Sequence, residues 1–243
     1  MNKIVALIPA RYAATRLPGK LMKILAGKTI IQRTYEAVLN TQLFDDVIVV
    51  CDDKIIFDEV LSFSGKAMMS MREHESGTDR IAEAAENLDA NIIVNIQGDE
   101  PFITKDSLAK VIDLFQDDEV QIGSLMLSIF DEEKINNPNC VKVVVDQQQK
   151  ALYFSRSAIP YHRNENETLS AFQHIGVYAF RKEILIRVSK LPWSRLEQIE
   201  KLENLRMLEN GIPIHLAIVN EVGISIDTAD DFAKAVEHLR SIT

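Results

Sequence analysis

The chain of 243 residues is long enough for one large α/β domain or two small ones, and its composition, 47% hydrophobic and 26% charged, is ordinary for a globular protein. Its net charge of −9 argues against a general nucleic-acid binder, because affinity for a phosphate backbone is supplied mainly by Lys and Arg. Two cysteines, no signal-peptide pattern and no apolar run near the roughly 20 residues that span a bilayer predict a cytoplasmic protein with no nucleic-acid partner and no membrane insertion.

Residues 3–9 form a continuous apolar run, which predicts a first strand buried in a parallel sheet. The loop that follows carries three cations, Arg11, Arg16 and Lys20, separated by small residues. Such a loop is ordinarily a solvated surface feature. Its place directly after the first strand favours phosphate binding, because small residues let backbone amides approach an anion while Arg and Lys bind phosphate oxygens. The spacings of a Walker P-loop and of a dinucleotide-binding glycine motif are both absent.

Strands and helices alternate through the first half of the chain. The hydrophobic patterns predict helices at residues 29–40, 54–63 and 104–115 and strands at residues 47–51, 67–71 and 121–129. This alternation predicts a parallel sheet with right-handed crossover connections.

A second group of polar residues, 72–80, leads into another predicted helix. Ser76 or Thr78 would cap that helix, which explains part of the pattern. Arg72 and Arg80 lie on either side of the Ser-Gly-Thr turn, and a helix N-terminus also binds anions and base edges. The capping and the ligand-binding interpretations are compatible, so both are kept.

Residues 92–96 predict another buried strand, which is followed by the sequence Gln-Gly-Asp-Glu-Pro. An acid just beyond the carboxyl end of a central parallel strand lies where open α/β sheets bind ligands. We therefore predict that Asp99 holds a divalent metal over a nucleotide phosphate, with Gln97 at the rim. The alternative is an ordinary strand-to-helix turn, and this segment taken alone does not decide between the two.

The character of the sequence changes in the second half of the chain. Two β-branched and aromatic runs, residues 141–146 and 151–154, are separated by a short polar turn, which is the signal of a β-hairpin. We predict a β-rich subdomain at residues 131–190, inserted within a single domain that spans residues 1–243.

Three further features lie in this half. His174 lies inside a predicted strand, residues 172–180, where a histidine is more often a hydrogen-bonded core residue than a ligand. Residues 196–209 have large apolar side chains at helical spacing, which predicts one amphipathic helix with its glutamates, Glu203 among them, in solvent. Asp227 precedes the last predicted helix and is either its N-cap or a second carboxylate for the metal.

Taken together, these motifs resemble the family of 3-deoxy-D-manno-octulosonate (Kdo) cytidylyltransferases along the whole chain. The first loop is common to many sugar nucleotidyltransferases, and the later motifs are specific to this family. The motifs are Pro-Ala-Arg at 9–11, Arg-Leu-Pro-Gly-Lys at 16–20, His-x-Ser-Gly-Thr-x-Arg at 74–80, Asn-Ile-Gln-Gly-Asp-Glu-Pro at 95–101, Tyr-Phe-Ser-Arg at 153–156, His-Ile-Gly at 174–176, the Leu- and Glu-rich segment 196–206 and Asp-Thr at 227–228.

The resemblance implies a Rossmann-like nucleotidyltransferase fold of the nucleotide-diphospho-sugar transferase type. Such a fold has a mainly parallel sheet with helices on both faces, and here a smaller inserted β-rich dimerisation subdomain. The resemblance also implies a homodimer, dependence on Mg²⁺, and the reaction CTP + Kdo → CMP-Kdo + diphosphate, which activates Kdo for lipopolysaccharide synthesis. The implied route is in-line attack of the anomeric hydroxyl of the sugar on the α-phosphate of CTP.

The resemblance also implies roles for residues of this chain. Those implied to bind the triphosphate are Arg11, Arg16 and Lys20. Those implied to surround the cytidine are Arg72, Ser76 and Arg80. Those implied to bind the sugar are Gln97, Arg156, His174 and Glu203, which replaces the core interpretation of His174 and the solvated interpretation of Glu203. Those implied to hold Mg²⁺ are Asp99 and Asp227, which with Lys20 and Arg11 would form the catalytic centre. No residue is identified as a general base.

Three positions depart from the common pattern of the family. Gln173 stands where an Arg often precedes the His, Arg195 stands in place of a Pro, and Ser225 stands in place of a Gly. These positions lie near the implied sugar and metal sites, so 8-amino-Kdo or another acidic sugar, such as a sialic acid, is an alternative substrate. A glycosyltransferase would need an Asp-x-Asp motif, which residues 99–101 match poorly. The alternative of a different class is a non-catalytic nucleotide-sugar sensor, which would bind CTP without releasing diphosphate.

Overall fold

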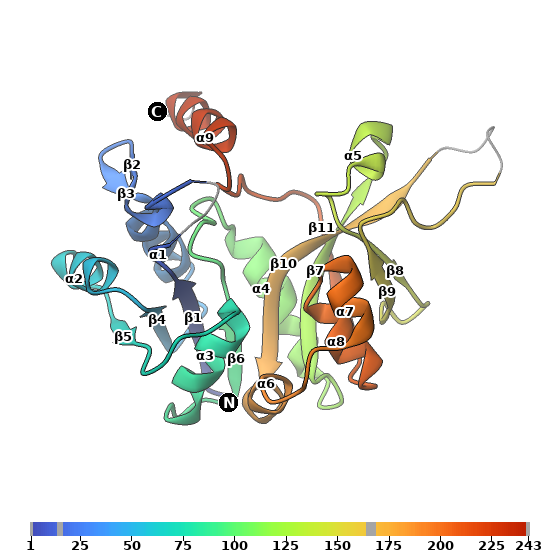
Figure 1. The fold of residues 1–243 in the computed structure, drawn as a ribbon, viewed down its shortest axis with the longest axis horizontal. Helices are drawn as coiled ribbons and strands as arrows, with labels where there is room; N and C mark the ends of the chain where they lie inside the picture. The colour runs from blue at the N-terminus through green and yellow to red at the C-terminus, as the bar shows by residue number, and fades with distance from the viewer. Residues whose placement is uncertain (1, 14–16, 164–168, 242–243) are drawn as a thin grey trace. The chain divides into compact units, whose positions relative to one another are not determined.

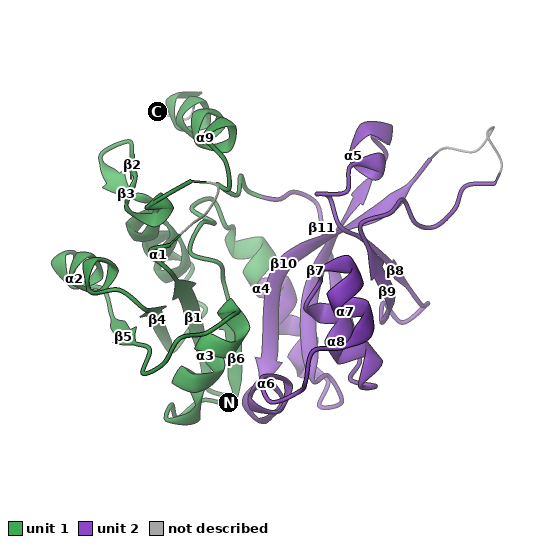
Figure 2. Ribbon diagram, in the orientation of Figure 1, with its two compact units in different colours: residues 1–108, 223–243 green, residues 109–222 purple. Residues whose placement is uncertain are grey.

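The computed structural model of the chain describes residues 2–13, 17–163 and 169–241. The chain forms two compact units, shown in Figure 2: unit 1 comprises residues 1–108 and 223–243, and unit 2 comprises residues 109–222. Unit 1 is therefore built from both ends of the chain. The predicted subdomain at residues 131–190 lies inside unit 2, and its role as a separate insertion stays a prediction.

The sheet of unit 1 consists of parallel strands in the order β6, β1, β4, β5 (Figure 1). These strands are β1 (Ile4–Ala10), β4 (Asp46–Cys51), β5 (Ala67–Met69) and β6 (Ile92–Asn95). Most residues of β1, β4 and β6 are buried, as expected of parallel strands covered on both faces. Because parallel strands point the same way, their carboxyl ends lie along one edge of the sheet, and the loops after β1 and β6 begin there.

Among the described residues, four α-helices lie wholly in unit 1, and three of them connect its strands. They are α1 (Ile30–Asn40), α2 (Lys54–Ser62), α3 (Gly77–Glu86) and, from the end of the chain, α9 (Ala229–Ser241). The first three begin at the side chains of Thr29, Asp53 and Ser76, each of which accepts a hydrogen bond from a backbone N–H two or three residues further on. Of the two caps proposed for α3, Ser76 is therefore the correct one. In the described parts of the chain, no helix combines the length and the apolar composition that crossing a bilayer requires.

Unit 2 follows a different plan, with antiparallel pairing. Its strands are β7 (Ile122–Ile129), β8 (Lys142–Val145), β9 (Ala151–Ser155), β10 (Ala171–Arg181) and β11 (Ile214–Val219). Strand β10 is antiparallel to β7 and β8, whereas β11 is parallel to β7. Strands β8 and β9 form an antiparallel hairpin, which confirms the hairpin predicted from the sequence. The helices are α4 (Lys105–Asp113), in which the chain enters this unit, then α5 (Glu132–Asn136), α6 (Lys182–Val188), α7 (Arg195–Glu200) and α8 (Asn204–Glu209).

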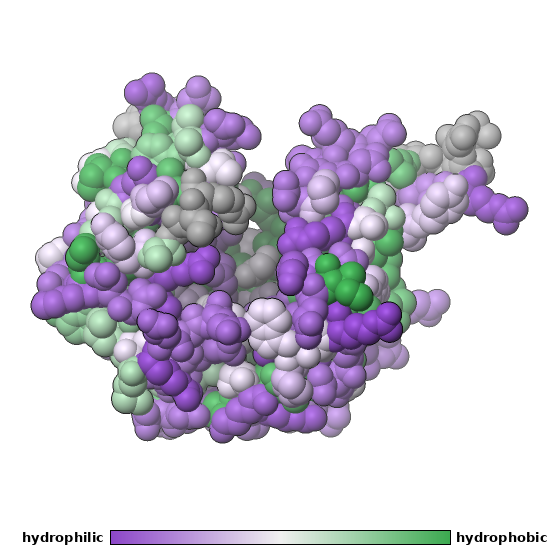
Figure 3. Space-filling view, in the orientation of Figure 1, coloured by the Kyte–Doolittle hydropathy of each residue, from purple (hydrophilic) through white to green (hydrophobic). Residues whose placement is uncertain are grey.

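The prediction of one amphipathic helix at residues 196–209 is wrong. The chain forms α7 and α8 instead, and Lys201 between them has a left-handed backbone with φ of 54°. The break changes which side chains are buried: Glu197 is 6% exposed and pairs with Arg206, with contacts of 2.8 and 2.5 Å, while Ile199 is 65% exposed. Figure 3 shows apolar surface over α7 and α8 within a mainly hydrophilic face. A helical period calculated across the whole segment could not predict this, because the register restarts at Lys201.

Candidate active site

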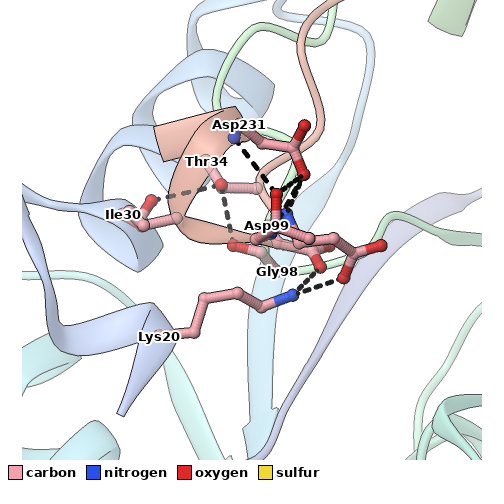
Figure 4. Close-up of polar contacts among 8 residues, drawn as sticks. Lys20, Ile30, Thr34, Gly98, Asp99 and Asp231 are labelled. Atoms are coloured by element: carbon pink, nitrogen blue, oxygen red, sulfur yellow. Dashed lines mark hydrogen bonds and ion pairs between the residues drawn. The ribbon is translucent and has the colours of Figure 1, made fainter. Parts of the chain in front are cut away.

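Lys20 joins two acids that lie far apart in the sequence. It begins a short 3₁₀ helix, Lys20–Met22, directly after Gly19, whose φ of 63° favours glycine. The Lys20 ammonium donates hydrogen bonds to the carboxylate of Asp99 and, at 2.9 Å, to that of Asp227 (Figure 4). The two acids predicted as metal ligands are therefore neighbours in space, beside the cationic loop that follows β1.

Asp99 is placed by close packing of the loop that follows β6. The carbonyl oxygen of Gly98 accepts a hydrogen bond from Thr34 Oγ1 of α1 at 2.9 Å. A Cβ atom on Gly98 would lie 3.1 Å from the carbonyl oxygen of Pro9 and 3.3 Å from Leu21, so a larger residue would push this loop away from β1. The glycine is thus favoured by the close approach of two backbone segments at the edge of the sheet.

Asp227 is held in place by the start of α9. The backbone N–H of Ile226 donates to the carbonyl oxygen of Asp99 at 3.0 Å, which ties the two acidic segments together. Thr228 and Asp231 form a reciprocal cap: the N–H of Asp231 donates to Thr228 Oγ1 at 3.2 Å, and the N–H of Thr228 donates to the Asp231 carboxylate at 2.9 Å. The N-cap interpretation of Asp227 is therefore wrong, and its carboxylate faces Lys20 instead.

The charges of this cluster favour a cation. Burial alone would lower the pKa of Lys20, but the carboxylates of Asp99 and Asp227 outweigh it and hold this pKa above its ordinary value. Burial, together with the same two carboxylates, raises the pKa of the neighbouring Glu100 to about 7. Acidic groups thus gather around one ammonium group, in a place where added positive charge would be stabilised.

The donor set fits Mg²⁺ in chemistry and in number. Carboxylate oxygens are hard ligands, and Mg²⁺ in phosphoryl-transfer sites is commonly held by one or two carboxylates together with substrate phosphates and water. Asp99 and Asp227 would supply such a pair. Among the residues that the structure describes, no group of three or more His, Cys, Asp or Glu side chains has the arrangement of a site made from protein ligands alone.

Two cavities in unit 1 adjoin these groups. The larger, about 400 Å³, is lined by Lys20, Asp99 and Asp227 and by Arg11 of the cationic loop. The smaller, about 170 Å³, is lined by residues 74–77 and by Arg80. Pro9, Arg11 and Gln97 line both cavities, so the predicted residues Lys20 on one side and Ser76 and Arg80 on the other surround adjoining spaces, whereas Arg72 lines neither. Arg16, the third predicted triphosphate ligand, lies outside the described residues.

The predicted cytidine residues differ in their surroundings. Ser76 Oγ accepts from the N–H of Asp79 at 3.0 Å, and the side chain of Arg72 is 68% exposed. Arg80 is only 5% exposed: its guanidinium donates to the carbonyl oxygen of Ala10 and, at 2.7 Å, to the carboxylate of Asp52. Its hydrogen bonds thus hold the start of the cationic loop, and direct contact of Arg80 with a nucleotide stays a prediction.

Arg156 and His174, two of the residues predicted to bind the sugar, lie in unit 2. The guanidinium of Arg156 donates to the carbonyl oxygens of Glu200, Pro138 and Lys201 at 2.7, 3.0 and 3.3 Å, so Arg156 fastens the segment between α7 and α8. His174 Nε2 lies 3.2 Å from Ser124 Oγ, and burial lowers the pKa of this imidazole to about 4.

Glu203 and Gln97 complete that set. Glu203 precedes α8 in unit 2. Burial raises the pKa of Tyr178, whose ring lies 5.4 Å from that of His174, and the charge of Glu203 adds to this effect. Gln97 lies in unit 1, where it lines both cavities. Binding of the sugar by these residues stays a prediction.

Sequence reasoning missed two acids that shape this region. Asp52 follows β4 as Asp99 follows β6, so the rule that identified Asp99 could also have identified Asp52. Glu83 of α3 is buried against residues 71–74. The position of Glu83 three residues after Arg80 does not indicate that Glu83 is buried, because an acid at this spacing from an arginine is common on a solvated helix face.

Comparisons with known proteins agree along the whole chain. The chain is 56% identical over 243 residues to the 3-deoxy-manno-octulosonate cytidylyltransferase of Flavobacterium johnsoniae, a match that covers 99% of this chain and 100% of the relative. It is 50% identical over 237 residues to the protein of the same name from Christiangramia forsetii, covering 96% of each. A family model described as cytidylyltransferase matches residues 5–217.

Solved structures show the same likeness. The structure of a CMP:2-keto-3-deoxy-manno-octonic acid synthetase complexed with CTP superposes with a TM-score of 0.95 at 38% identity, covering 99% of this chain and 100% of that one. The 4-diphosphocytidyl-2C-methyl-D-erythritol synthase of Anaerococcus prevotii superposes with a TM-score of 0.65 at 14% identity, which shows the fold alone. The predicted α/β nucleotidyltransferase fold is confirmed, while the dimerisation role of the β-rich part stays a prediction.

Proposed function

The chain belongs to the cytidylyltransferase family and within it to the 3-deoxy-manno-octulosonate cytidylyltransferases, and on this premise we propose that it catalyses CTP + Kdo → CMP-Kdo + diphosphate. It is then a sugar nucleotidyltransferase that activates Kdo. The observation that carries the proposal is the identity to relatives of this name along the full length of both chains. The meeting of Lys20, Asp99 and Asp227 beside the cationic loop supports it independently.

The reaction needs positive charge at the place where the structure has Lys20. The anomeric hydroxyl of Kdo attacks the α-phosphorus of CTP in line with the departing diphosphate. Both substrates are anions, since Kdo carries a carboxylate, so their approach is repulsive unless protein groups compensate it. Lys20 and Arg11 line the larger cavity, where they would bind the phosphates and stabilise charge that develops on the leaving diphosphate. Arg16 is proposed to act with them.

We propose that Asp99 and Asp227 hold Mg²⁺. The pair fits because one oxygen of each carboxylate contacts the same group, the Lys20 ammonium, so the two acids face a common position for positive charge. Bound Mg²⁺ supplies neutralisation of the phosphates and polarisation of the reacting oxygen atoms. The two acids orient this charge, and the close packing around Gly98 holds Asp99 in place.

The remaining roles follow the same proposal. Arg72, Ser76 and Arg80 would surround the cytidine; Ser76 and Arg80 line the smaller cavity, and Arg80 also donates to the carbonyl oxygen of Ala10 at the start of the cationic loop. The residues proposed to bind the sugar are Gln97, Arg156, His174 and Glu203. We further propose a homodimer, a cytoplasmic location and a place in lipopolysaccharide synthesis; these proposals rest on the resemblance of the motifs to the family.

A diphosphate-release assay tests the proposed function. The purified protein is given CTP and Mg²⁺ with Kdo, with 8-amino-Kdo or with a sialic acid, in parallel. We expect diphosphate release with Kdo at a kcat/KM well above that for the other two sugars. A higher kcat/KM with 8-amino-Kdo would move the specificity to that sugar, and CTP binding without release on any sugar would favour the sensor.

A further inference from the structure

Glu83 is a buried acid of α3 that holds the segment between β5 and α3. It is 7% exposed. One of its carboxylate oxygens accepts a hydrogen bond from the backbone N–H of Met71 at 2.7 Å. The other is hydrogen-bonded to His74 Nε2 and lies 3.4 Å from Nε of Arg72. One side chain of the helix therefore contacts three residues of the preceding segment.

The segment formed by residues 71–75 has an anchor on each side. Before it, the N–H of Ser70 donates to the carbonyl oxygen of Cys51 at 2.8 Å, and after it, Ser76 caps α3. Between these anchors the segment gains little from apolar burial, because Met71 is 82% exposed and the side chain of Arg72 is 68% exposed. Its conformation therefore depends on polar contacts, of which Glu83 supplies three.

The charge of Glu83 is maintained by these same partners. Burial alone would raise the pKa of Glu83, but the N–H of Met71 together with His74 and Arg72 lowers it below its ordinary value. Glu83 is thus ionised at neutral pH. A buried ionised carboxylate rarely adds net stability over an apolar residue of similar size. We therefore explain the presence of Glu83 by the conformation in which it holds its three partners, and not by a gain in the stability of the fold.

The end of this segment lies at the smaller cavity. His74, Glu75 and Ser76 line it, together with Arg11 and Gln97. A shift of residues 71–75 would change the shape of this cavity. Lys20, Asp99 and Asp227 line the other cavity and are anchored by α1, β1 and α9, so the shift would leave them in place.

We propose that Glu83 is a positioning residue that sets the affinity and base selectivity for CTP by holding residues 71–75 in the conformation that receives the cytosine. The inference rests on the proposed function, since it takes the smaller cavity as the base side of the CTP site. Because Glu83 acts on binding and does not contact the reacting atoms, its loss changes KM for CTP and not kcat.

The test compares Glu83→Ala and Glu83→Gln with the wild-type enzyme. Alanine removes all three contacts, whereas glutamine keeps an acceptor for the Met71 N–H and loses the charge that faces Arg72. We expect Glu83→Ala to raise KM for CTP about tenfold and Glu83→Gln about threefold, with kcat within about twofold of wild type in both. The preference for CTP over UTP, measured as the ratio of the two kcat/KM values, should be highest in the wild type, lower in Glu83→Gln and lowest in Glu83→Ala. Hydrogen exchange at the amides of residues 71–75 becomes faster in the same order.

Glu86→Ala is the matched control, because Glu86 is an exposed acid on the same helix. It should leave KM, base preference and exchange at wild-type values. If KM for CTP in Glu83→Ala stays within twofold of wild type, or if kcat falls while KM does not change, the proposal is overturned. If Glu83→Ala does not fold, Glu83→Gln decides, and an unchanged KM for CTP in that variant overturns the proposal.

Calorimetric titration with CTP alone separates this inference from the proposed function. If the wild-type protein binds CTP but releases no diphosphate with Kdo, the proposed activity fails. The role of Glu83 is then still decided by the Kd for CTP, which should rise by the same factors in the two variants. If the variants bind CTP as tightly as wild type, the inference on Glu83 fails whatever the enzymatic activity.

Discussion

At the scale of single residues, Lys20 reduces the electrostatic repulsion between two neighbouring acids. Asp99 and Asp227 carry like charges at close quarters, and the Lys20 ammonium between them offsets their repulsion. The same ammonium is well placed to meet the phosphates of a nucleotide, because it lines the larger cavity together with Arg11. Lys20 thus offsets the repulsion within the acidic pair and is also the residue that we propose to bind the phosphates.

Asp99→Asn tests the role of this pair. Asparagine keeps the size of the side chain but loses the negative charge that would hold Mg²⁺, so we expect kcat to fall by about 10²-fold or more with the melting temperature nearly unchanged. Diphosphate release at saturating Mg²⁺ measures the rate, and thermal unfolding measures the fold. Asp230→Asn, an exposed acid at the start of α9, is the control and should keep full activity. A wild-type rate in Asp99→Asn would refute the metal role.

His174 predicts a dependence of stability on pH. Burial lowers the pKa of its imidazole to about 4, against about 6.5 in an unfolded chain. Between these values the unfolded chain binds a proton that the folded protein does not, so this contribution to stability is complete above about pH 6.5 and is lost as pH falls towards 4. We expect the free energy of unfolding of the wild type, relative to His174→Gln, to fall by about 2 kcal/mol between pH 7 and pH 5. Urea unfolding at each pH measures it, and a constant difference would contradict a buried neutral imidazole.

At the scale of secondary structure elements, the break between α7 and α8 decides which charges are buried. Lys201 takes a left-handed backbone, and this turn lets Glu197 of α7 meet Arg206 of α8 in the interior. The guanidinium of Arg156 binds the carbonyl oxygen of Lys201 at 3.3 Å. The turn also leads directly to Glu203, a proposed sugar ligand. The left-handed conformation of Lys201 therefore helps to position a predicted site residue.

Lys201→Gly tests this backbone conformation. The left-handed region costs a residue with a Cβ about 1 kcal/mol, so we expect glycine at this position to keep or raise the free energy of unfolding, by up to about 1 kcal/mol. Lys110→Gly in α4 is the matched control and should lower it by about 1 kcal/mol, since Lys110 is helical. Urea unfolding of both variants shows whether each substitution raises or lowers the free energy of unfolding. Equal destabilisation in both would show that Lys201 is not left-handed in solution.

At the scale of the whole molecule, unit 2 exposes the apolar side chain of Phe130, which directly follows β7. Phe130 is 64% exposed and borders a cavity of about 520 Å³ that is also lined by Val143, Pro160 and Phe172. Exposed apolar surface of this kind is typical of protein–protein interfaces. It supports the proposed homodimer and suggests that the subunits meet through unit 2.

Phe130→Glu tests this location of the interface. We expect the wild type to sediment as a dimer and the variant as a monomer at the same micromolar concentration, because a buried unpaired charge is costly. Leu39→Glu, at an exposed apolar position of α1 in unit 1, is the control and should remain dimeric. Sedimentation velocity measures all three proteins. A Phe130→Glu variant as dimeric as the wild type would place the interface elsewhere.

Much of the fold and of the candidate active site could be predicted from local sequence. The strands of unit 1 are short apolar runs, and their carboxyl ends lie at one edge of a parallel sheet by geometry alone. That rule was sufficient to choose Arg11, Lys20 and Asp99 as candidates. The helix cap at Ser76 could likewise be predicted, because it involves only residues within one helical turn of each other.

Contacts between distant residues were decided by the tertiary structure. The sequence alone allowed Asp227 to be either an N-cap or a metal ligand. In the structure, Thr228 and Asp231 form the cap, and the carboxylate of Asp227 accepts a hydrogen bond from Lys20. The burial of Glu83 and Glu197 had no local signal, because an acid at a helical position is ordinarily solvated and becomes buried only when a partner from another segment meets it. The sequence thus determined the candidate residues for the chemistry and the edge of the sheet at which they stand. Long-range packing decided which charges pair, since pairing depends on distances that no local pattern contains.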